Sequence, residues 1–228
     1  MNTRLRDRRA AAPFHFCDYE GLAMPTGQRA SNLRELLETV RTAPLTVLHH
    51  HLYRSQLRHR FGAWDFPNDF ASWAATALED RALAEKLSGL DPFAHADLES
   101  ARSALADVME DHLDGLAFVP WARPGAEFHL SSGHYFALPG DREAWTLGEL
   151  QDHLAEAPLN SLYYHFHEAR LRGPGDDSDD FSRWIEGQFG HLPLVDAFRR
   201  IDFFFYGLEE LRARLTGLLD QALAEDAA

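Results

Sequence analysis

The sequence has little cysteine and no long apolar run: Cys17 is the one thiol among 228 residues. A single cysteine cannot form an internal disulfide, which favours a reducing compartment. The charged N-terminus lacks the apolar stretch that follows in a secretory signal, and no run is long enough to span a bilayer. We therefore expect a soluble, cytoplasmic protein without a membrane partner.

Positive charge is also scarce, with 22 Lys and Arg against 36 Asp and Glu and a formal net charge of −14. An acidic surface repels phosphate backbones, so we expect no nucleic-acid partner. A small molecule or another protein is the kind of partner that remains. The one basic cluster lies in residues 1–13, which we expect to form a disordered tail.

Several signatures of known chemistry are missing. The sequence contains no Gly-rich phosphate loop, no serine nucleophile elbow and no cysteine-based zinc pattern. It therefore names neither a reaction nor a cofactor, and whether the protein is an enzyme stays open.

What the sequence does contain is a repetition of itself. The segment APLTVLHHH returns later as APLNSLYYH, with Pro44 and Pro158 separated by 114 positions. The spacing then falls to 111 between Asp69 and Asp180, so the second copy lacks three residues of a loop. Self-similarity at a fixed period indicates one packing unit used more than once.

The repeated motifs cover nearly the whole chain. We expect a first repeat unit at 14–113 and a second at 128–224, joined by a linker at 114–127. Two homologous units in tandem are expected to pack on each other as a pseudo-dimer.

Each repeat is expected to be mainly α, of the α+β class, with a short β-hairpin followed by about five helices. The hairpin is predicted from aromatic residues at 14–16 and apolar residues at 21–24, and from 128–130 and 134–138 in the second copy. Helices are predicted where a capping residue precedes apolar residues at helical spacing. The expected N-caps are Ser31, Asn68, Asp97, Thr146 and Asp179.

Two polar residue types keep their place in both copies. A helical projection puts His165, Glu168 and Arg172 together on the shoulder of a buried stripe. The same shoulder of the first copy carries His51 and Arg58. A half-buried polar side chain needs a partner, so these residues are the candidate site.

Three interpretations of the shared histidines remain open. His51 and His165 can each bond a carboxylate of their own repeat, Asp69 or Asp180, as buried polar groups usually do. They can bind a metal, with Glu168 one turn after His165 as a further ligand. They can also line a pocket for an anion or a sugar, together with the shared arginines.

The run His49–His51 resembles a metal-binding tract. Successive helical residues point about 100° apart, however, so we expect these side chains not to converge on one ion. The second copy has Tyr163 and Tyr164 at the first two places. Aromatic, partly buried filler is therefore the expected role.

Four further residues are expected to support the site. Asp69 and Asp180 follow expected N-caps and can orient the shared histidines, as carboxylates behind metal-bound histidines do. Trp73 and Trp184 lie three residues after a phenylalanine, which favours core anchors over stacking platforms for sugar rings.

The segment LYYHFHEARLR at 162–172, followed by DFSRW at 180–184 and Ile201-Asp202, resembles an uncharacterised bacterial and archaeal family known as a domain of unknown function. The first-copy segments at 49–60 and 67–70 resemble it too. The resemblance implies no established activity and supplies no catalytic residues. It slightly favours a sugar-linked ligand.

The expected function is that of a non-catalytic binding or accessory protein for a sugar or an anionic metabolite. Its polar cleft would lie between the two repeats, lined by His51, Arg58, His165, Glu168 and Arg172. One alternative is a metal-dependent enzyme that uses His165 and Glu168 with His51. Another is a structural partner of a second protein.

Overall fold

The computed structural model describes residues 4–57, 66–172 and 178–227. The fold is mostly helical with one two-stranded antiparallel sheet, which confirms the α+β class. The chain divides into two compact units. We call residues 21–135 the central unit, and residues 1–20 with 136–228 the terminal unit.

The helices of the two units follow one another in a similar order. Those of the central unit are α1 (Leu33–Thr42), α2 (Leu45–Tyr53), η1 (Arg54–Leu57), α3 (Asp69–Thr76), α4 (Arg81–Ser88), η2 (Pro92–Ala94) and α5 (Leu98–Asp114). Those of the terminal unit are α6 (Leu147–Glu156), α7 (Leu159–Tyr163), the π-helical turn η3 (Tyr164–Glu168), α8 (Ala169–Leu171), α9 (Asp180–Phe189), α10 (Leu192–Arg199), η4 (Phe203–Phe205) and α11 (Leu208–Ala227).

Local capping explains where most of these helices begin. The side chains of Asn68, Asp97, Thr146 and Asp179 each accept a hydrogen bond from a backbone N–H of the first turn, as predicted. The predicted cap at Ser31 is wrong by one residue. Asn32 caps α1, because its side chain rather than the serine hydroxyl reaches the N–H of Glu35.

The two strands are far longer than expected. β1 runs over Phe14–Ala30 and β2 over Phe128–Ala144, and they pair with each other. The predicted hairpin within each repeat is therefore wrong. Pro25 does not turn the chain, since a two-stranded ribbon has only edge strands, where a missing N–H is tolerated.

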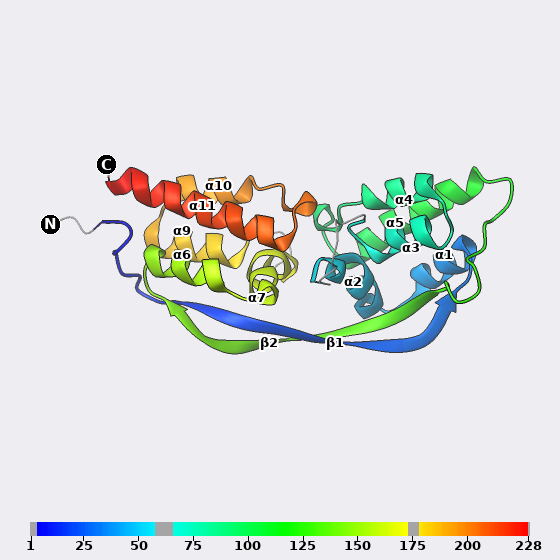
Figure 1. The fold of residues 1–228 in the computed structure, drawn as a ribbon, viewed down its shortest axis with the longest axis horizontal. Coiled ribbons are helices and arrows are strands. Elements are labelled where there is room, and N and C mark those ends of the chain that lie inside the picture. The colour runs from blue at the N-terminus through cyan, green and yellow to red at the C-terminus, as the bar shows by residue number, and fades with distance from the viewer. Residues whose placement is uncertain (1–3, 58–65, 173–177, 228) are drawn as a thin grey trace. The chain divides into compact units, whose positions relative to one another are not determined.

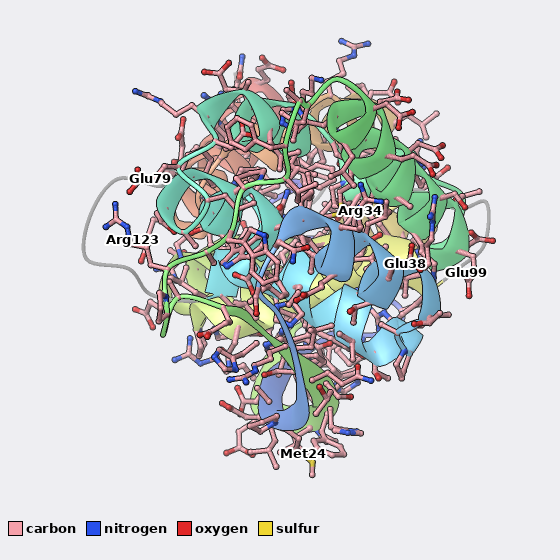
Figure 2. The ribbon with its side chains drawn as sticks, turned by 90° about the vertical axis from the view of Figure 1, so that its right-hand side faces the viewer. Met24, Arg34, Glu38, Glu79, Glu99 and Arg123 are labelled. Atoms are coloured by element: carbon pink, nitrogen blue, oxygen red, sulfur yellow. The ribbon has the colours of Figure 1, made fainter. Side chains whose placement is uncertain are left out.

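Each unit takes part of both strands, and in each unit the helices lie on one face of that part of the ribbon (Figure 1). The ribbon also carries exposed apolar side chains, Leu22 and Met24 in the central unit and Phe136 and Leu138 in the terminal unit. Met24 is seen at the edge of Figure 2.

The compact units therefore do not follow the predicted repeat boundaries 14–113 and 128–224. The start of β1 belongs with the helices of the second repeat, and the start of β2 with those of the first. The residues between α5 and β2, predicted as a linker at 114–127, are irregular beyond Asp114. Within the central unit Arg123 of this segment pairs with Glu79 (Figure 2).

Tyr135 occupies an unusual place in the ribbon of the central unit. Its ring lies against the backbone of Gly21 on the other strand and of Gly133 on its own, where a Cβ would collide with it. A side chain at either position would force this ring to move.

The prediction of a disordered tail is wrong for residues 4–13. Leu5 and Ala10 are buried, and the N–H of Ala10 donates to the carbonyl of Trp145 at 2.7 Å. The guanidinium of Arg9 lies 3.9 Å above the Trp145 ring, a favourable cation–π distance. Apolar burial and a cation–π contact thus hold a segment whose charge suggested a solvated tail.

None of the helices in the described part of the chain is long and apolar enough to cross a membrane. The cytoplasmic location stays a prediction.

Candidate functional site

The first shared histidine lies inside the central unit. His51 of α2 is buried, and its Nδ1–H donates to Oδ2 of Asp69 at 2.7 Å. Its Nε2 accepts the backbone N–H of Ser131 in β2 at 3.0 Å. Both nitrogens of the ring are thus used within the unit.

The second shared histidine repeats this arrangement inside the terminal unit. His165 lies on the π-helical turn η3, and its Nδ1–H donates to Oδ2 of Asp180 at 2.9 Å. Its Nε2 accepts the backbone N–H of Cys17 in β1 at 2.9 Å. Cys17 and Ser131 are 114 positions apart, like the histidines that they contact.

The strand contacts determine the tautomer of these rings. A backbone N–H can only donate, so the Nε2 facing it must carry a lone pair and the proton must sit on Nδ1. Burial lowers the pKa of His165, although the hydrogen bond to Asp180 opposes this effect. Each ring is therefore a neutral link between a helix and a strand. A metal ion or a substrate proton could reach Nε2 only if the strand bond broke.

Asp180 is the centre of a larger polar network. Besides His165, it accepts hydrogen bonds from Nη2 of Arg172 and, at 2.5 Å, from Nη2 of Arg183. Arg172 also donates through Nη1 to the Tyr164 hydroxyl at 2.6 Å, and its guanidinium lies 4.1 Å above that ring. The side chains of Arg172 and Arg183 are 39% and 36% exposed, so the network reaches the surface.

The charges of this network alter its acidity. Burial acts to raise the pKa of Asp180, but the hydrogen bonds from His165 and Arg183 and the charge of Arg172 outweigh it and lower the pKa to about 2. Asp180 is thus a carboxylate at any ordinary pH. Burial raises the pKa of Tyr164, with Arg172 opposing, so the hydroxyl keeps its proton.

Cys17 does not have the surroundings of a nucleophile. Burial, and then the negative charge of Asp180, raise the pKa of its thiol. A reactive cysteine requires a lowered pKa, so the contribution of Cys17 to the site is its backbone N–H.

The central unit carries a different set of side chains beside its histidine. Nδ1 of His50 and the Tyr135 hydroxyl are 2.5 Å apart and share a hydrogen bond, and the guanidinium of Arg54 lies 3.9 Å above the Tyr135 ring. Ligand atoms of His50, His51 and Asp69 lie within 4.8 Å of one another. We expected the histidines of 49–51 not to converge on one ion, yet the ring centroids of His50 and His51 lie 4.9 Å apart, so this pair is close enough to share one.

The two tryptophans lie at matching places in the units. Nε1 of Trp73 donates to the carbonyl of Ala126 at 2.8 Å, and Nε1 of Trp184 to that of Ala12 at 2.9 Å. Each ring packs edge-on against a phenylalanine of the strand, Phe128 or Phe14. Trp73 is buried, as expected for a core anchor, whereas Trp184 is half-buried.

The remaining predicted residues are not all brought together. Glu168 is half-buried on η3, and its charge contributes to raising the pKa of Tyr164. Arg58 lies outside the described residues. The predicted metal set is divided, since His51 belongs to the central unit while His165 and Glu168 belong to the terminal unit.

Several participants were missed by sequence reasoning. Arg183 and Tyr164 complete the network around Asp180, and His50 and Tyr135 complete the central cluster. Tyr135 lies on a strand, so the helical spacing that identified the other candidates could not identify it. The two backbone donors carry no side-chain signal at all.

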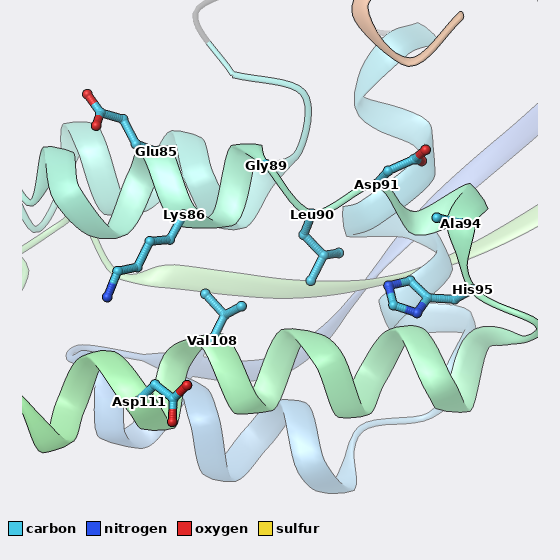
Figure 3. A pocket seen from close by; sticks show the side chains of 9 residues that line it. All are labelled: Glu85, Lys86, Gly89, Leu90, Asp91, Ala94, His95, Val108 and Asp111. Carbon is cyan, nitrogen blue, oxygen red and sulfur yellow. The ribbon is translucent and has the colours of Figure 1, made fainter. Parts of the chain in front are cut away.

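A surface groove of about 620 Å³ lies elsewhere in the central unit, between α4 and α5 (Figure 3). Leu90 and Val108 face each other across it, with His95 toward one end and Lys86 and Asp111 toward the other. None of the predicted site residues that the structure describes lines this groove.

Comparison with known proteins adds a family and a related structure. The model of a family of unknown function, DUF5752, matches residues 11–220. The structure of OrfY from Thermoproteus tenax is similar at a TM-score of 0.74 and 34% sequence identity, covering 97% of this chain and 99% of that chain. No curated protein matches.

Proposed function

The chain belongs to the family of unknown function DUF5752, and we propose that it is a non-catalytic binding or accessory protein for an anionic metabolite, such as a sugar phosphate. The proposed site is the edge of the network around Asp180 in the terminal unit. The predicted cleft between the repeats is not needed for this proposal, because each histidine has its partners within its own unit.

One observation carries the proposal: two half-exposed guanidinium groups share the single carboxylate of Asp180. A guanidinium has five N–H donors in a planar fork that suits phosphate and carboxylate oxygens. The contacts of Arg172 engage only its two terminal nitrogens. The Tyr164 ring holds this fork in place, which reduces the entropy that binding would cost.

We further propose that the chain arose by tandem duplication of one repeat, giving a pseudo-dimer. The matched pairs His51–Asp69 and His165–Asp180, each with a strand N–H on Nε2, support this origin. The second repeat then acquired its own surface. Arg183 has Ser72 as its counterpart, so the two guanidinium groups beside Asp180 are a feature of the terminal unit.

Thermal unfolding with a panel of inorganic phosphate, sugar phosphates and uncharged sugars tests the binding proposal. A phosphorylated ligand at a concentration of about 100 times its Kd should raise Tm by about 5–10 °C, while the matching uncharged sugar should leave Tm unchanged. Arg172→Gln should abolish the shift. Arg199→Gln, which removes an equally exposed arginine paired with Glu186 on α9, should preserve it. A flat response to the whole panel would overturn the proposal.

A metal-dependent enzyme is the second candidate, favoured by the closeness of His50, His51 and Asp69. Against it, a metal on either nitrogen of His51 would displace the bond to Asp69 or to Ser131. We therefore expect less than one equivalent of metal by elemental analysis of protein purified without a His-tag. A stoichiometric ion, lost in His50→Gln, would instead establish the metal site and reject the binding role as the main function.

A further inference from the structure

We propose that the two repeats are reciprocal partners, each completing the other's core with its strand, so that they stay assembled without the covalent link between them. The partner surface is the inward aromatic face of each strand, and the partner that it fits is the helical face of the sister repeat. This inference goes beyond the proposed ligand and does not depend on it.

In the terminal unit the first repeat supplies aromatic residues to the core of the second. Phe14 is 5% exposed and its ring lies 5.0 Å from Phe181, stacked at 28°, and 4.8 Å from His165. Phe16 beside it is equally buried. The segment is held along its length, since Asn160 donates to the carbonyl of Tyr19 at 2.8 Å.

The central unit shows the same exchange in the opposite direction. Phe128 of the second repeat is 5% exposed, and its ring stacks on Phe70 at 5.1 Å and 9° and lies 4.9 Å from His51. Ser132 bonds Thr46 of α2 at 2.8 Å, where Asn160 is the counterpart of Thr46. Aromatic burial and matched polar bonds thus join the repeats twice.

This arrangement is that of a strand-exchanged dimer whose two halves are joined covalently in one chain. Domain exchange normally joins identical chains at little cost, because each contact already exists within the fold. The first part of each strand lies in the other unit, so each repeat covers the helices of its sister with that part and its own helices only with the second part. The connection at 115–127 adds contacts of its own to the first repeat, such as the bond from Ala122 N–H to the carbonyl of Ser31, and these contacts survive a cut after Ala117.

The test cuts the whole folded protein at that connection. A protease recognition sequence is inserted between Ala117 and Phe118, which are exposed, and the purified chain is cleaved. We expect the two fragments to elute together with the mass of the uncut chain, 25.9 kDa plus the insert, and to separate only in denaturant. Two separate folded fragments after cleavage would overturn the proposal.

Two variants test whether the contacts of β2 with the helices hold the cleaved fragments together. In the cleaved protein Phe128→Ala should weaken fragment association on the order of 100-fold, because a large buried ring is lost. Phe136→Ala is the matched control on the same strand, since that ring is 59% exposed, and it should leave association unchanged. If both variants behave alike, the inward face of β2 is not the partner surface. Circular dichroism of the uncut variants separates weakened association from failure to fold.

Discussion

Replacement of Asp179 by alanine is expected to lower the free energy of unfolding by about 3–5 kcal/mol. Asp179 is fully buried, pairs with the buried Arg170 at 3.2 Å, and caps α9 by accepting the N–H of Ser182. Burial raises the pKa of this carboxyl, with Arg170 opposing. Removing it loses the cap and takes away the carboxylate that offsets the desolvation of the Arg170 guanidinium, which keeps its contacts with the rings of Phe166 and Phe203.

The first repeat suggests the variants that separate these two causes. Asn68, the counterpart of Asp179, caps α3 in the same way without a charge. Asp179→Asn should therefore retain the cap and lose only the charge interaction, and adding Arg170→Met should recover part of the stability. Urea unfolding measures all three variants. Glu186→Ala, at an exposed pair with Arg199, is the control and should change stability by about 1 kcal/mol or less. Equal losses of unfolding free energy for Asp179→Ala and Glu186→Ala would show that the buried pair stabilises the fold no more than an exposed pair does.

Acidification below about pH 6.5 should weaken the fold through two buried histidines. Burial and the nearby Arg170 lower the pKa of His167 to about 3, and burial lowers that of His165. In the unfolded chain both rings take up a proton as the pH falls below about 6.5, whereas the folded chain keeps them neutral. The unfolded state thus binds more protons, and stability falls with pH by up to about 1.4 kcal/mol per unit for each ring. For His167 this loss continues down to about pH 3.

Urea unfolding at about pH 7.5, 6.5 and 5.5 measures this dependence. His167→Tyr is the informative variant, because Tyr53 stands at the same place in the first repeat and is equally buried. This variant should reduce the slope of unfolding free energy against pH by about the contribution of one histidine. His129→Gln, at an exposed position of β2, should leave the slope unchanged. A slope in His167→Tyr as steep as in the unchanged protein would contradict the assignment.

The sequence was informative where structure is local. Apolar spacing and capping residues such as Asn68 and Thr146 predict the helices, because a cap and its first turn lie within four residues. The pairing of His51 with Asp69 was one of the predicted alternatives, since both residue types are kept at the same spacing in the second copy.

The sequence was uninformative about pairing, because two similar strand segments could each pack on the same set of helices. The strands of the two repeats have alike patterns, so local sequence does not decide whether a strand stays with its own helices or crosses to the others. Pro25 and Gly27 indicated a turn, yet they lie within β1. The N–H groups of Cys17 and Ser131, which complete both histidine arrangements, belong to the backbone and have no residue preference.

The ring of Tyr135 against Gly21 has a consequence for how the repeats could diverge. These two positions are 114 apart, so they are counterparts that also face each other. In an assembly of two identical polypeptides both places would hold the same residue, and a large ring could not meet a bare backbone there. On the proposed origin by duplication, encoding the two repeats in one gene removes that constraint. The tyrosine that contacts His50 could thus evolve in the second repeat alone. The two halves of one polypeptide can then differ from each other as the subunits of a heterodimer do.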